Sequence, residues 1–565
     1  MKPFANKYNL FLLNKLLLKS YPLTSAAARV CLFLAASFAL LMPIFFIVGF
    51  PIPFLQGTPF KVKSLRKLFE IASILFVVGL ALHPRRSEKT KSLVEKLNGI
   101  AQFPGTIWIL AAVYFVLFLW QQISKYWALE INFIPFLFYD YMLWYFEQGK
   151  VCFTGLLHGY YHLNLIMYLL YPVWKIFQSP WLLHIASSFI VALSAVPYYF
   201  WSKARLKNPV PALVFAFLFL NYRFTQNLLD VNFAVEVFYP LFILSAVYFA
   251  EIKKNVLYFS AVALGLLVKE DSFIYFGALG LLYLVIGPDR KRGAMTLLLA
   301  CLYPILLLKA VIPWSGSTIL RGDLNNFSDM GHEMDQIGLH MLNKPWVLIQ
   351  QLFVPLEKVR TLFKLTSKLL FLPLISPWFF LVLAAVAPVF SHSGGRGDQF
   401  FQLAFYYGAP ALPFVFLALT DSWHRLEKWI RPRPYLYGSA LVALVFLNGF
   451  NLRPLHFTQD DVKTVQLAQT LPSDRVVVTQ GHLLPYIGYR KLNFYVSDQY
   501  LKRPDTKEIY PRADYFLFDF EANAYPKTTE DLRQMAELLR RDPQYRITFE
   551  DHRRLLLEKK PQAIS

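Results

Sequence analysis

Residues 181–207 read WLLHIASSFIVALSAVPYYFWSKARLK, an apolar run from Trp181 to Phe200 followed by Lys203, Arg205 and Lys207. A run of this length without acidic or basic residues can cross the hydrocarbon core of a bilayer as a helix. Basic residues at one end are typical of the cytoplasmic side, where membrane proteins concentrate lysine and arginine. This stretch therefore predicts a transmembrane helix whose carboxyl end faces the cytoplasm.

The composition extends this interpretation to the whole chain. Of its 565 residues, 56% are hydrophobic and 16% are charged, whereas a soluble protein carries about 25% charged residues. The net charge of +21 comes from basic residues in short loops beside apolar runs, which is a membrane pattern and not a nucleic-acid-binding surface. The three cysteines provide neither a disulfide framework nor a metal-ligand spacing. We therefore expect no nucleic-acid partner.

From residue 105 onward, basic clusters occur at every second junction between apolar runs, which predicts alternating membrane crossings. We expect an all-α polytopic membrane protein of about 13 transmembrane helices, with its N-terminus in the cytoplasm. The stretch His162–Trp174 breaks the alternation, so we interpret it as a re-entrant or surface helix. The weakest predicted span is Leu362–Ile375, because Lys364 and Lys368 interrupt it.

Three parts are predicted along the chain. Residues 1–104 form a membrane anchor with two spans, Val30–Phe50 and Leu68–Leu82, and residues 105–451 form the main transmembrane domain. Residues 452–565 contain strand-like runs at 475–479, 515–518 and 545–549 and an amphipathic helical pattern at 529–541. These patterns indicate a small extracytoplasmic α/β domain.

The acidic residues suggest where the chemistry lies. Between residues 100 and 315 there are nine, and seven occur at predicted outer junctions: Glu130, Asp140, Glu147, Asp230, Glu236, Glu270 and Asp271. Carboxylates at the ends of apolar helices are functional candidates, because burying them is costly. The alternative is that each is simply solvated at the membrane edge.

The triplet Lys269-Glu270-Asp271 is the sharpest local feature. In a tight hairpin, one carboxylate could face the interior of the bundle while Lys269 binds a phosphate; the alternative is an ordinary polar hairpin tip. Asp140 lies among aromatic residues and could act as a general base for a hydroxyl, or could cap the following helix. Arg223 could bind a phosphate bidentately, although such a residue is more often a surface charge.

Four segments resemble those of a bacterial and archaeal membrane-protein family, domain of unknown function 2079. Residues 138–144 (FYDYMLW) are similar to its F-D-Q-x-L-W segment, and His162 precedes an apolar stretch as the family's histidine does. Residues 236–240 (EVFYP) are similar to H-P-E-x-x-x-P, although Ala234 and Val235 replace the His-Pro pair. Residues 267–271 match L-V-K-E-D.

That family in turn resembles the C-type glycosyltransferase superfamily. The resemblance implies a bacterial inner membrane location, a polyprenyl-phosphate-linked sugar as donor, and an active site on the outer face among membrane lipids. It further implies an acid in the first large outer segment as catalytic base, which is Asp140 here, with Glu130 as the second candidate. The acceptor is an extracytoplasmic glycan, lipid or protein.

The remaining candidates are assigned to binding. We expect Glu236, Glu270 and Asp271 to bind acceptor hydroxyls or a divalent cation, Mg²⁺ or Mn²⁺, with Glu270 and Asp271 as the metal ligands. Lys269 and Arg223 would face the donor phosphate, and His162 would contact substrate. Two other functions remain open: a transporter or lipid flippase, for which no inverted repeat is visible, and a non-catalytic scaffold that has kept the fold.

Overall fold

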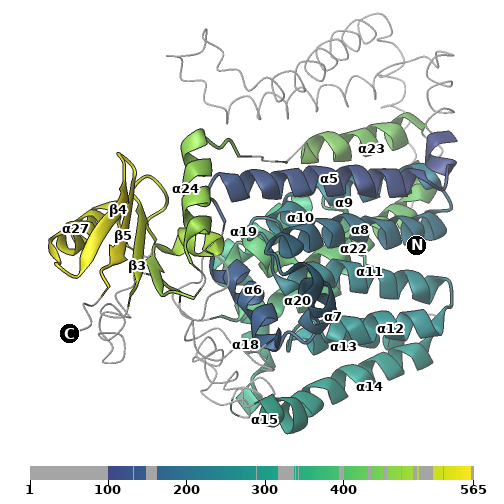
Figure 1. Ribbon diagram of the computed structural model, residues 1–565. Helices are drawn as coiled ribbons and strands as arrows, with labels where there is room; N and C mark the ends of the chain where they lie inside the picture. The colour runs from purple at the N-terminus through teal and green to yellow at the C-terminus, as the bar shows by residue number, and fades with distance from the viewer. Residues whose placement is uncertain are drawn as a thin grey trace, which may run out of the picture.

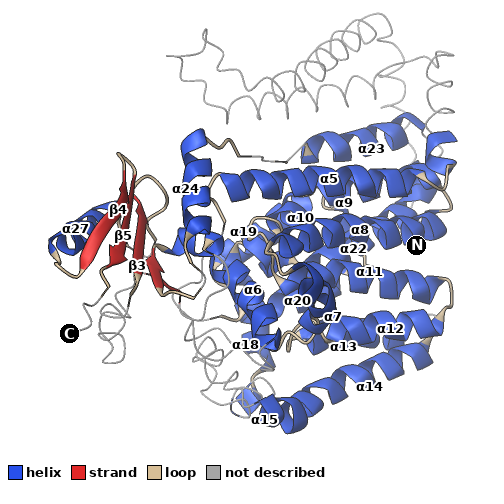
Figure 2. Ribbon diagram, viewed as in Figure 1, coloured by secondary structure: helices blue, strands red, loops and turns tan. Residues whose placement is uncertain are grey.

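The computed structural model describes residues 99–561 with gaps, the longest of which are 148–161, 316–335, 393–399 and 496–512. The predicted spans Val30–Phe50 and Leu68–Leu82 lie outside the described residues. Long helices lie side by side in a bundle, and a small sheet stands at one end of it (Figures 1 and 2). The chain is therefore mostly helical with one strand-containing part, as the sequence predicts.

Helices that follow each other in the chain pack together in the bundle, such as α11 on α12 and α13 on α14, and α5 packs on α8 across two intervening short helices. Its main helices are α5 (Thr106–Trp127), α8 (Trp181–Leu206), α9 (Pro209–Asn221), α11 (Phe238–Glu251), α12 (Asn255–Leu266), α13 (Ser272–Val285), α14 (Arg290–Leu306), α20 (Phe379–Phe390), α22 (Ala411–Ile430) and α23 (Pro434–Asn448).

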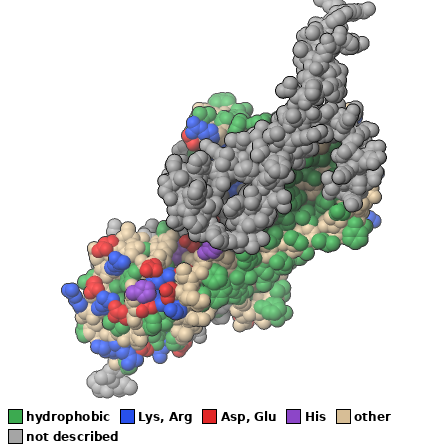
Figure 3. All heavy atoms as spheres, turned by 90° about the horizontal axis from the view of Figure 1, so that it is seen from above, with side chains coloured by type: hydrophobic (Ala, Val, Ile, Leu, Met, Phe, Trp, Pro, Cys, Tyr) green, Lys and Arg blue, Asp and Glu red, His purple; other side chains and the backbone are tan. Residues whose placement is uncertain are grey.

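Three helices of the described part are long and apolar enough to cross a membrane. They are α5, α8 and residues Arg290–Trp314, where α14 continues through a π-helical turn (η3, Leu307–Val311) into α15 (Ile312–Ser315). Leu298, Leu302 and Ile305 of α14 are about half exposed, as expected of side chains that face lipid. On the face seen in Figure 3, hydrophobic side chains cover the described bundle, while charged ones gather on the sheet. The total of about 13 spans stays a prediction.

The bundle also contains short helices, and those labelled α6, α18 and α19 in Figure 1 lie near the end that carries the sheet. The short helices are α6 (Phe133–Glu147), α7 (Met167–Phe177), α10 (Arg223–Asn227), η2 (Val235–Val237), α18 (Pro345–Phe353), α19 (Leu356–Ser367), η5 (Leu372–Ile375) and η6 (Phe405–Gly408). Helix α6 crosses the ends of the long helices instead of running along them. The predicted surface helix His162–Trp174 corresponds to α7, which has only 11 residues.

The predicted span Leu362–Ile375 is wrong. Helix α19 ends at Ser367, and the next helical turn, η5, begins only at Leu372. Leu370 and Phe371 between them both have a φ of 56°, a left-handed conformation that interrupts a right-handed helix. The segment is therefore a short amphipathic helix followed by a turn.

The sheet has the strand order β2-β1-β3-β5-β4, in which β1 is parallel to β2 and β3, and β5 is antiparallel to β3 and β4. Its elements are α24 (Gln459–Thr470), β1 (Val477–Thr479), η7 (Gly481–Tyr486), β2 (Asn493–Tyr495), β3 (Tyr515–Asp519), α27 (Thr529–Arg541), β4 (Tyr545–Glu550) and β5 (Arg554–Lys559). The predicted strands and helix are present, and the sheet contains two further strands: β2, and β5, which follows the strand that was expected to be last.

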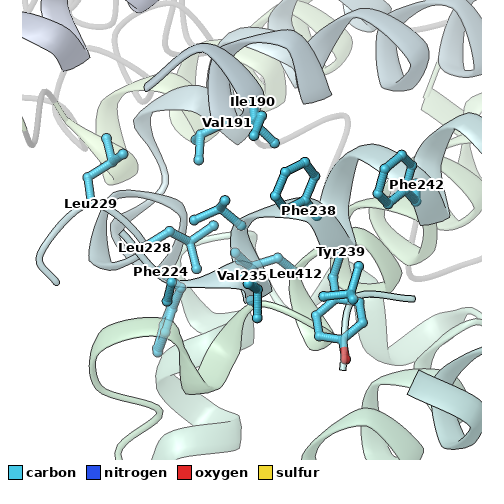
Figure 4. Packing of buried hydrophobic residues seen from close by; sticks show 14 of the residues in the cluster. Ile190, Val191, Phe224, Leu228, Leu229, Val235, Phe238, Tyr239, Phe242 and Leu412 are labelled. Atoms are coloured by element: carbon cyan, nitrogen blue, oxygen red, sulfur yellow. The ribbon is translucent and has the colours of Figure 1, made fainter. Parts of the chain in front are cut away.

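Hydrogen bonds join the sheet-containing part to the carboxyl end of α5. The Tyr486 hydroxyl donates to the carbonyl of Tyr126 over 2.7 Å, and the Gln469 amide donates to the Tyr126 hydroxyl over 3.0 Å. Within the bundle, an apolar core from α8, α10, α11 and α22 includes Val191, Phe238 and Leu412 (Figure 4). This core supports the ends of the helices that carry the charged residues.

Candidate functional site

The Lys269-Glu270-Asp271 triplet forms the turn between α12 and α13. The Ser272 hydroxyl stabilises this turn, because it accepts from the Lys269 N–H over 3.1 Å and donates to the Lys269 carbonyl over 2.5 Å. The side chains of Lys269 and Glu270 are only 13% and 20% exposed. The triplet is therefore not an ordinary solvated hairpin tip.

Lys269 is paired with Glu236, a residue of η2 that lies 33 positions earlier in the chain. The distance from Lys269 Nζ to Glu236 Oε1 is 3.2 Å, and the Glu236 side chain is 6% exposed. Burial alone would lower the pKa of Lys269, but Glu236, Asp271 and Glu270 raise it well above its usual value. Glu236 Oε2 is buried and has no hydrogen-bond partner among the described residues.

Glu270 faces the segment that leads into α7. His162 Nδ1 lies 2.5 Å from Glu270 Oε1, and the backbone N–H of Leu163 donates to Glu270 Oε2 over 3.0 Å. The Ile166 N–H donates to the Leu267 carbonyl over 2.8 Å, which fixes the same segment along the turn. Burial raises the pKa of Glu270, but His162 and Lys269 outweigh it and lower the pKa to about 2.

Asp271 stands at the N-cap position of α13 without capping it. Its two carboxylate oxygens instead accept from the hydroxyls of Tyr239 and Tyr275, each over 2.8 Å. The two tyrosine rings meet edge to face at 5.1 Å. The sequence analysis did not predict Tyr239 as a site residue. Its position three residues after Glu236, about one helical turn, was the sequence signal that could have indicated it.

We call Glu236, Lys269, Glu270, Asp271 and His162 the acidic cluster. Its side chains do not fit a metal ion. The Glu270 carboxylate is hydrogen-bonded to His162 and to a backbone N–H, and the Asp271 carboxylate accepts hydrogen bonds from two tyrosine hydroxyls. Among the residues that the structure describes, no group of three His, Cys, Asp or Glu side chains could hold a metal ion.

Asp140 lies in the middle of α6 and is 6% exposed. Its position excludes the alternative that it caps this helix. The preceding residue, Tyr139, forms a hydrogen bond with the backbone of Val235 and is close enough to Glu236, Lys269 and Glu270 to be affected by their charges. Asp140 itself acts electrostatically on Tyr126. Helix α6 therefore connects Asp140 to the acidic cluster through its neighbour in the chain.

Arg223 belongs to a second group, which we call the Lys125 cluster: Lys125, Arg223 and Asp230. Lys125 Nζ lies 3.1 Å from Asp230 Oδ1, and an Arg223 guanidinium nitrogen lies 3.6 Å from Asp230 Oδ2. Lys125 also donates to the Leu229 carbonyl over 3.0 Å. The group carries two positive charges and one negative charge. Glu130 lies in the exposed loop after α5, within electrostatic reach of Lys125.

His184 was also missed. It lies in the first turn of α8, is fully buried, and stacks on Phe136 of α6 at 4.7 Å. Neither ring nitrogen has a hydrogen-bond partner among the described residues. A polar residue inside an apolar run was the only sequence signal, and that signal does not distinguish a buried contact from a functional one.

The fold and these clusters describe a membrane protein with buried charged groups near one end of its helices. The chain belongs to the DUF2079 family of predicted membrane proteins, whose model matches residues 138–552. Among solved structures, it is similar to ArnT from Cupriavidus metallidurans in the apo state, with 12% identity and a TM-score of 0.36. That similarity covers 81% of this chain and 100% of ArnT. No curated protein matches it.

Proposed function

We propose that the protein is a membrane glycosyltransferase that transfers a sugar from a polyprenyl-phosphate carrier to an extracytoplasmic glycan, lipid or protein. The supporting observation is the acidic cluster, in which Glu236, Glu270 and Asp271 share a buried position with one lysine. Burying several carboxylates is costly, and chains retain such groups mainly for function. Carboxylates accept hydrogen bonds from the hydroxyls that sugars present.

The distribution of basic residues supports an outer location for the acidic cluster. Lys203 and Arg205 lie at the carboxyl end of α8, Lys253 and Lys254 follow α11, and Arg290–Arg292 begin α14. Each of these ends is opposite to the end that adjoins the acidic cluster or the sheet (Figure 1). Because membrane proteins place such basic residues in the cytoplasm, the proposal puts the sheet outside a bacterial inner membrane and the N-terminus inside.

In the proposed reaction, Asp140 accepts the proton of the acceptor hydroxyl. The acceptor oxygen then attacks the anomeric carbon, the bond from that carbon to the phosphate oxygen breaks, and the polyprenyl phosphate leaves with the electron pair. Direct displacement inverts the anomeric carbon. Glu130 is the second candidate for the base, but it is exposed whereas Asp140 is buried beside aromatic residues.

The two clusters suggest different binding roles. Three carboxylates surround Lys269, so its single positive charge offsets only part of their negative charge, and Glu236 Oε2 is available to accept a sugar hydroxyl. The Lys125 cluster has an excess of positive charge, and Arg223 in it is suited to the donor phosphate. His162 orients Glu270. No step in this proposal uses a metal ion.

The test is Asp140→Asn in proteoliposomes supplied with polyprenyl-phosphate-linked sugars and a cell-envelope acceptor fraction. We expect transfer to fall by about 100-fold or more, the usual effect of losing a general base, with unchanged protein level and melting temperature. Glu147→Gln is the matched control, because Glu147 ends the same helix and is exposed. A normal transfer rate in Asp140→Asn would overturn the assignment of the base.

A further inference from the structure

Helices α18 and α19 present an apolar face that no described residue covers. Trp346, Ile349 and Phe353 of α18 are spaced by three and four residues, and they are 60%, 61% and 41% exposed. This spacing places them on one face of the helix. On α19, Val359 and Phe363 are similarly exposed at a spacing of four residues. In a membrane protein, a short helix pair with such a face lies against lipid.

Lys358 of α19, in contrast, is buried. It is 4% exposed, its Nζ donates to the Gln351 carbonyl over 2.7 Å, and the same Nζ lies 4.4 Å from the centre of the Phe401 ring. Among the described residues, no carboxylate pairs with it. Burial lowers the pKa of Lys358 to about 8. An ammonium has three donors, and a buried one without a negative partner is costly.

Aromatic residues between positions 400 and 407 lead from Lys358 toward the acidic cluster. Phe400 is the neighbour of Phe401 in the chain, and its ring lies 4.6 Å from that of Tyr407. Tyr407 contacts Tyr406 at 4.6 Å, and Tyr406 is close enough to Glu236 and Lys269 to be affected by their charges. Lys358 therefore lies between the lipid-facing helix pair and the site proposed above.

We propose that α18 and α19 dock a polyprenyl phosphate from the surrounding leaflet, with Lys358 binding its phosphate and the apolar face of the pair contacting its prenyl chain. This inference rests on the proposed function and adds the place where the sugar-free carrier, the product of the proposed transfer, exchanges between the protein and the leaflet. A phosphate monoester presents terminal oxygens and more charge than a phospholipid diester, which suits a single ammonium with unused donors. The step is binding only, and no covalent bond changes.

The test measures polyprenyl phosphate binding to the full chain in phosphatidylcholine nanodiscs. Lys358→Met should weaken binding about tenfold or more, the effect of losing one charged hydrogen bond, while Lys358→Arg should stay close to wild type. Lys364→Met is the matched control, since Lys364 is exposed on the same helix, and it should change binding less than twofold. An uncharged polyprenol should bind wild type and Lys358→Met equally.

Unchanged binding in Lys358→Met would overturn the inference. Equal displacement of polyprenyl phosphate by phosphatidylglycerol would also overturn it, because the surface would then bind anionic lipids in general. The assay needs no sugar transfer, so the two proposals fail separately. Lys358-dependent binding without transfer from any donor would contradict the glycosyltransferase, whereas transfer with Lys358-independent binding would contradict the docking surface.

Discussion

Two buried carboxylates differ in how completely they are hydrogen-bonded: Asp519 in the sheet-containing part and Glu236 at the helix ends. Asp519 of β3 is fully buried, and its oxygens accept from Arg553 Nε over 2.7 and 2.8 Å. They also accept from the Thr464 hydroxyl and from two backbone N–H groups. Glu236 is nearly as buried, yet one of its oxygens has no partner among the described residues.

The difference distinguishes a fully hydrogen-bonded ion pair from a buried carboxylate that can still accept a hydrogen bond. Both carboxylate oxygens of Asp519 accept hydrogen bonds, and this network joins β3, α24 and the residues before β5. Lys269 contacts Glu236 Oε1. Glu236 Oε2 has no partner among the described residues, so the free energy of removing this oxygen from water is not offset by a hydrogen bond. That unpaired oxygen is the atom to which the proposed function assigns a sugar hydroxyl.

The largest expected effect is on the structural side of this comparison. Asp519→Ala removes the fully buried carboxylate that Arg553 Nε contacts and leaves Asp461, at 2.8 Å, as the nearest remaining partner of Arg553. Breaking a buried pair in this way costs about 3 kcal/mol, so the sheet should unfold locally. Hydrogen exchange of β3 and α24 measures this loss. Glu558→Gln is the control, because its partner Arg546 is 55% exposed and such pairs contribute about 1 kcal/mol or less. Unchanged protection in Asp519→Ala would show that the network is not structural.

The next effect is on the functional side. Glu236→Gln keeps an oxygen for Lys269 but removes the negative charge, so we expect transfer to fall by about 100-fold, equivalent to about 2.7 kcal/mol of activation free energy. The melting temperature should change much less than in Asp519→Ala. If instead Glu236→Gln unfolds the protein while transfer per folded molecule stays normal, Glu236 is a structural residue like Asp519.

Part of this comparison was predictable from the sequence. The helical class, the strands predicted at 475–479 and 515–518, and the position of the Lys269-Glu270-Asp271 triplet in a turn between two helices all follow from local patterns. The pairing of Lys269 with Glu236 and of His162 with Glu270 spans 33 and 108 positions, and periodicity carries no information on such contacts. The same limit concealed Lys358, because its contacts with the Gln351 carbonyl and the Phe401 ring depend on how the chain folds.

A smaller effect is expected from pH. The pKa of Glu270 is lowered to about 2 from an ordinary value of 4.5, so its ionised form stabilises the folded state fully above pH 4.5. This contribution is lost as the pH falls from 4.5 toward 2. The melting temperature of wild type should therefore decline over this interval more steeply than that of Glu270→Gln. Parallel curves would mean that the contact with His162 contributes no stability.

The smallest effect is expected from metal removal. Glu270 and Asp271 are occupied by protein donors, so chelation with EDTA should leave transfer within twofold of the untreated rate. Titration with Mg²⁺ and Mn²⁺ after chelation is the control. Restoration of a lost activity by either ion would contradict this assignment and would favour the metal role expected from the sequence.

The most direct test of the account is native mass spectrometry of the gently solubilised full chain beside its Asp140→Asn and Glu236→Gln variants. We expect a co-purifying polyprenyl phosphate or its sugar-bearing form, with the sugar-bearing form enriched in Asp140→Asn because transfer is blocked. The contradicting result is ordinary phospholipids alone in all three proteins, which would favour a scaffold or a transporter of another substrate.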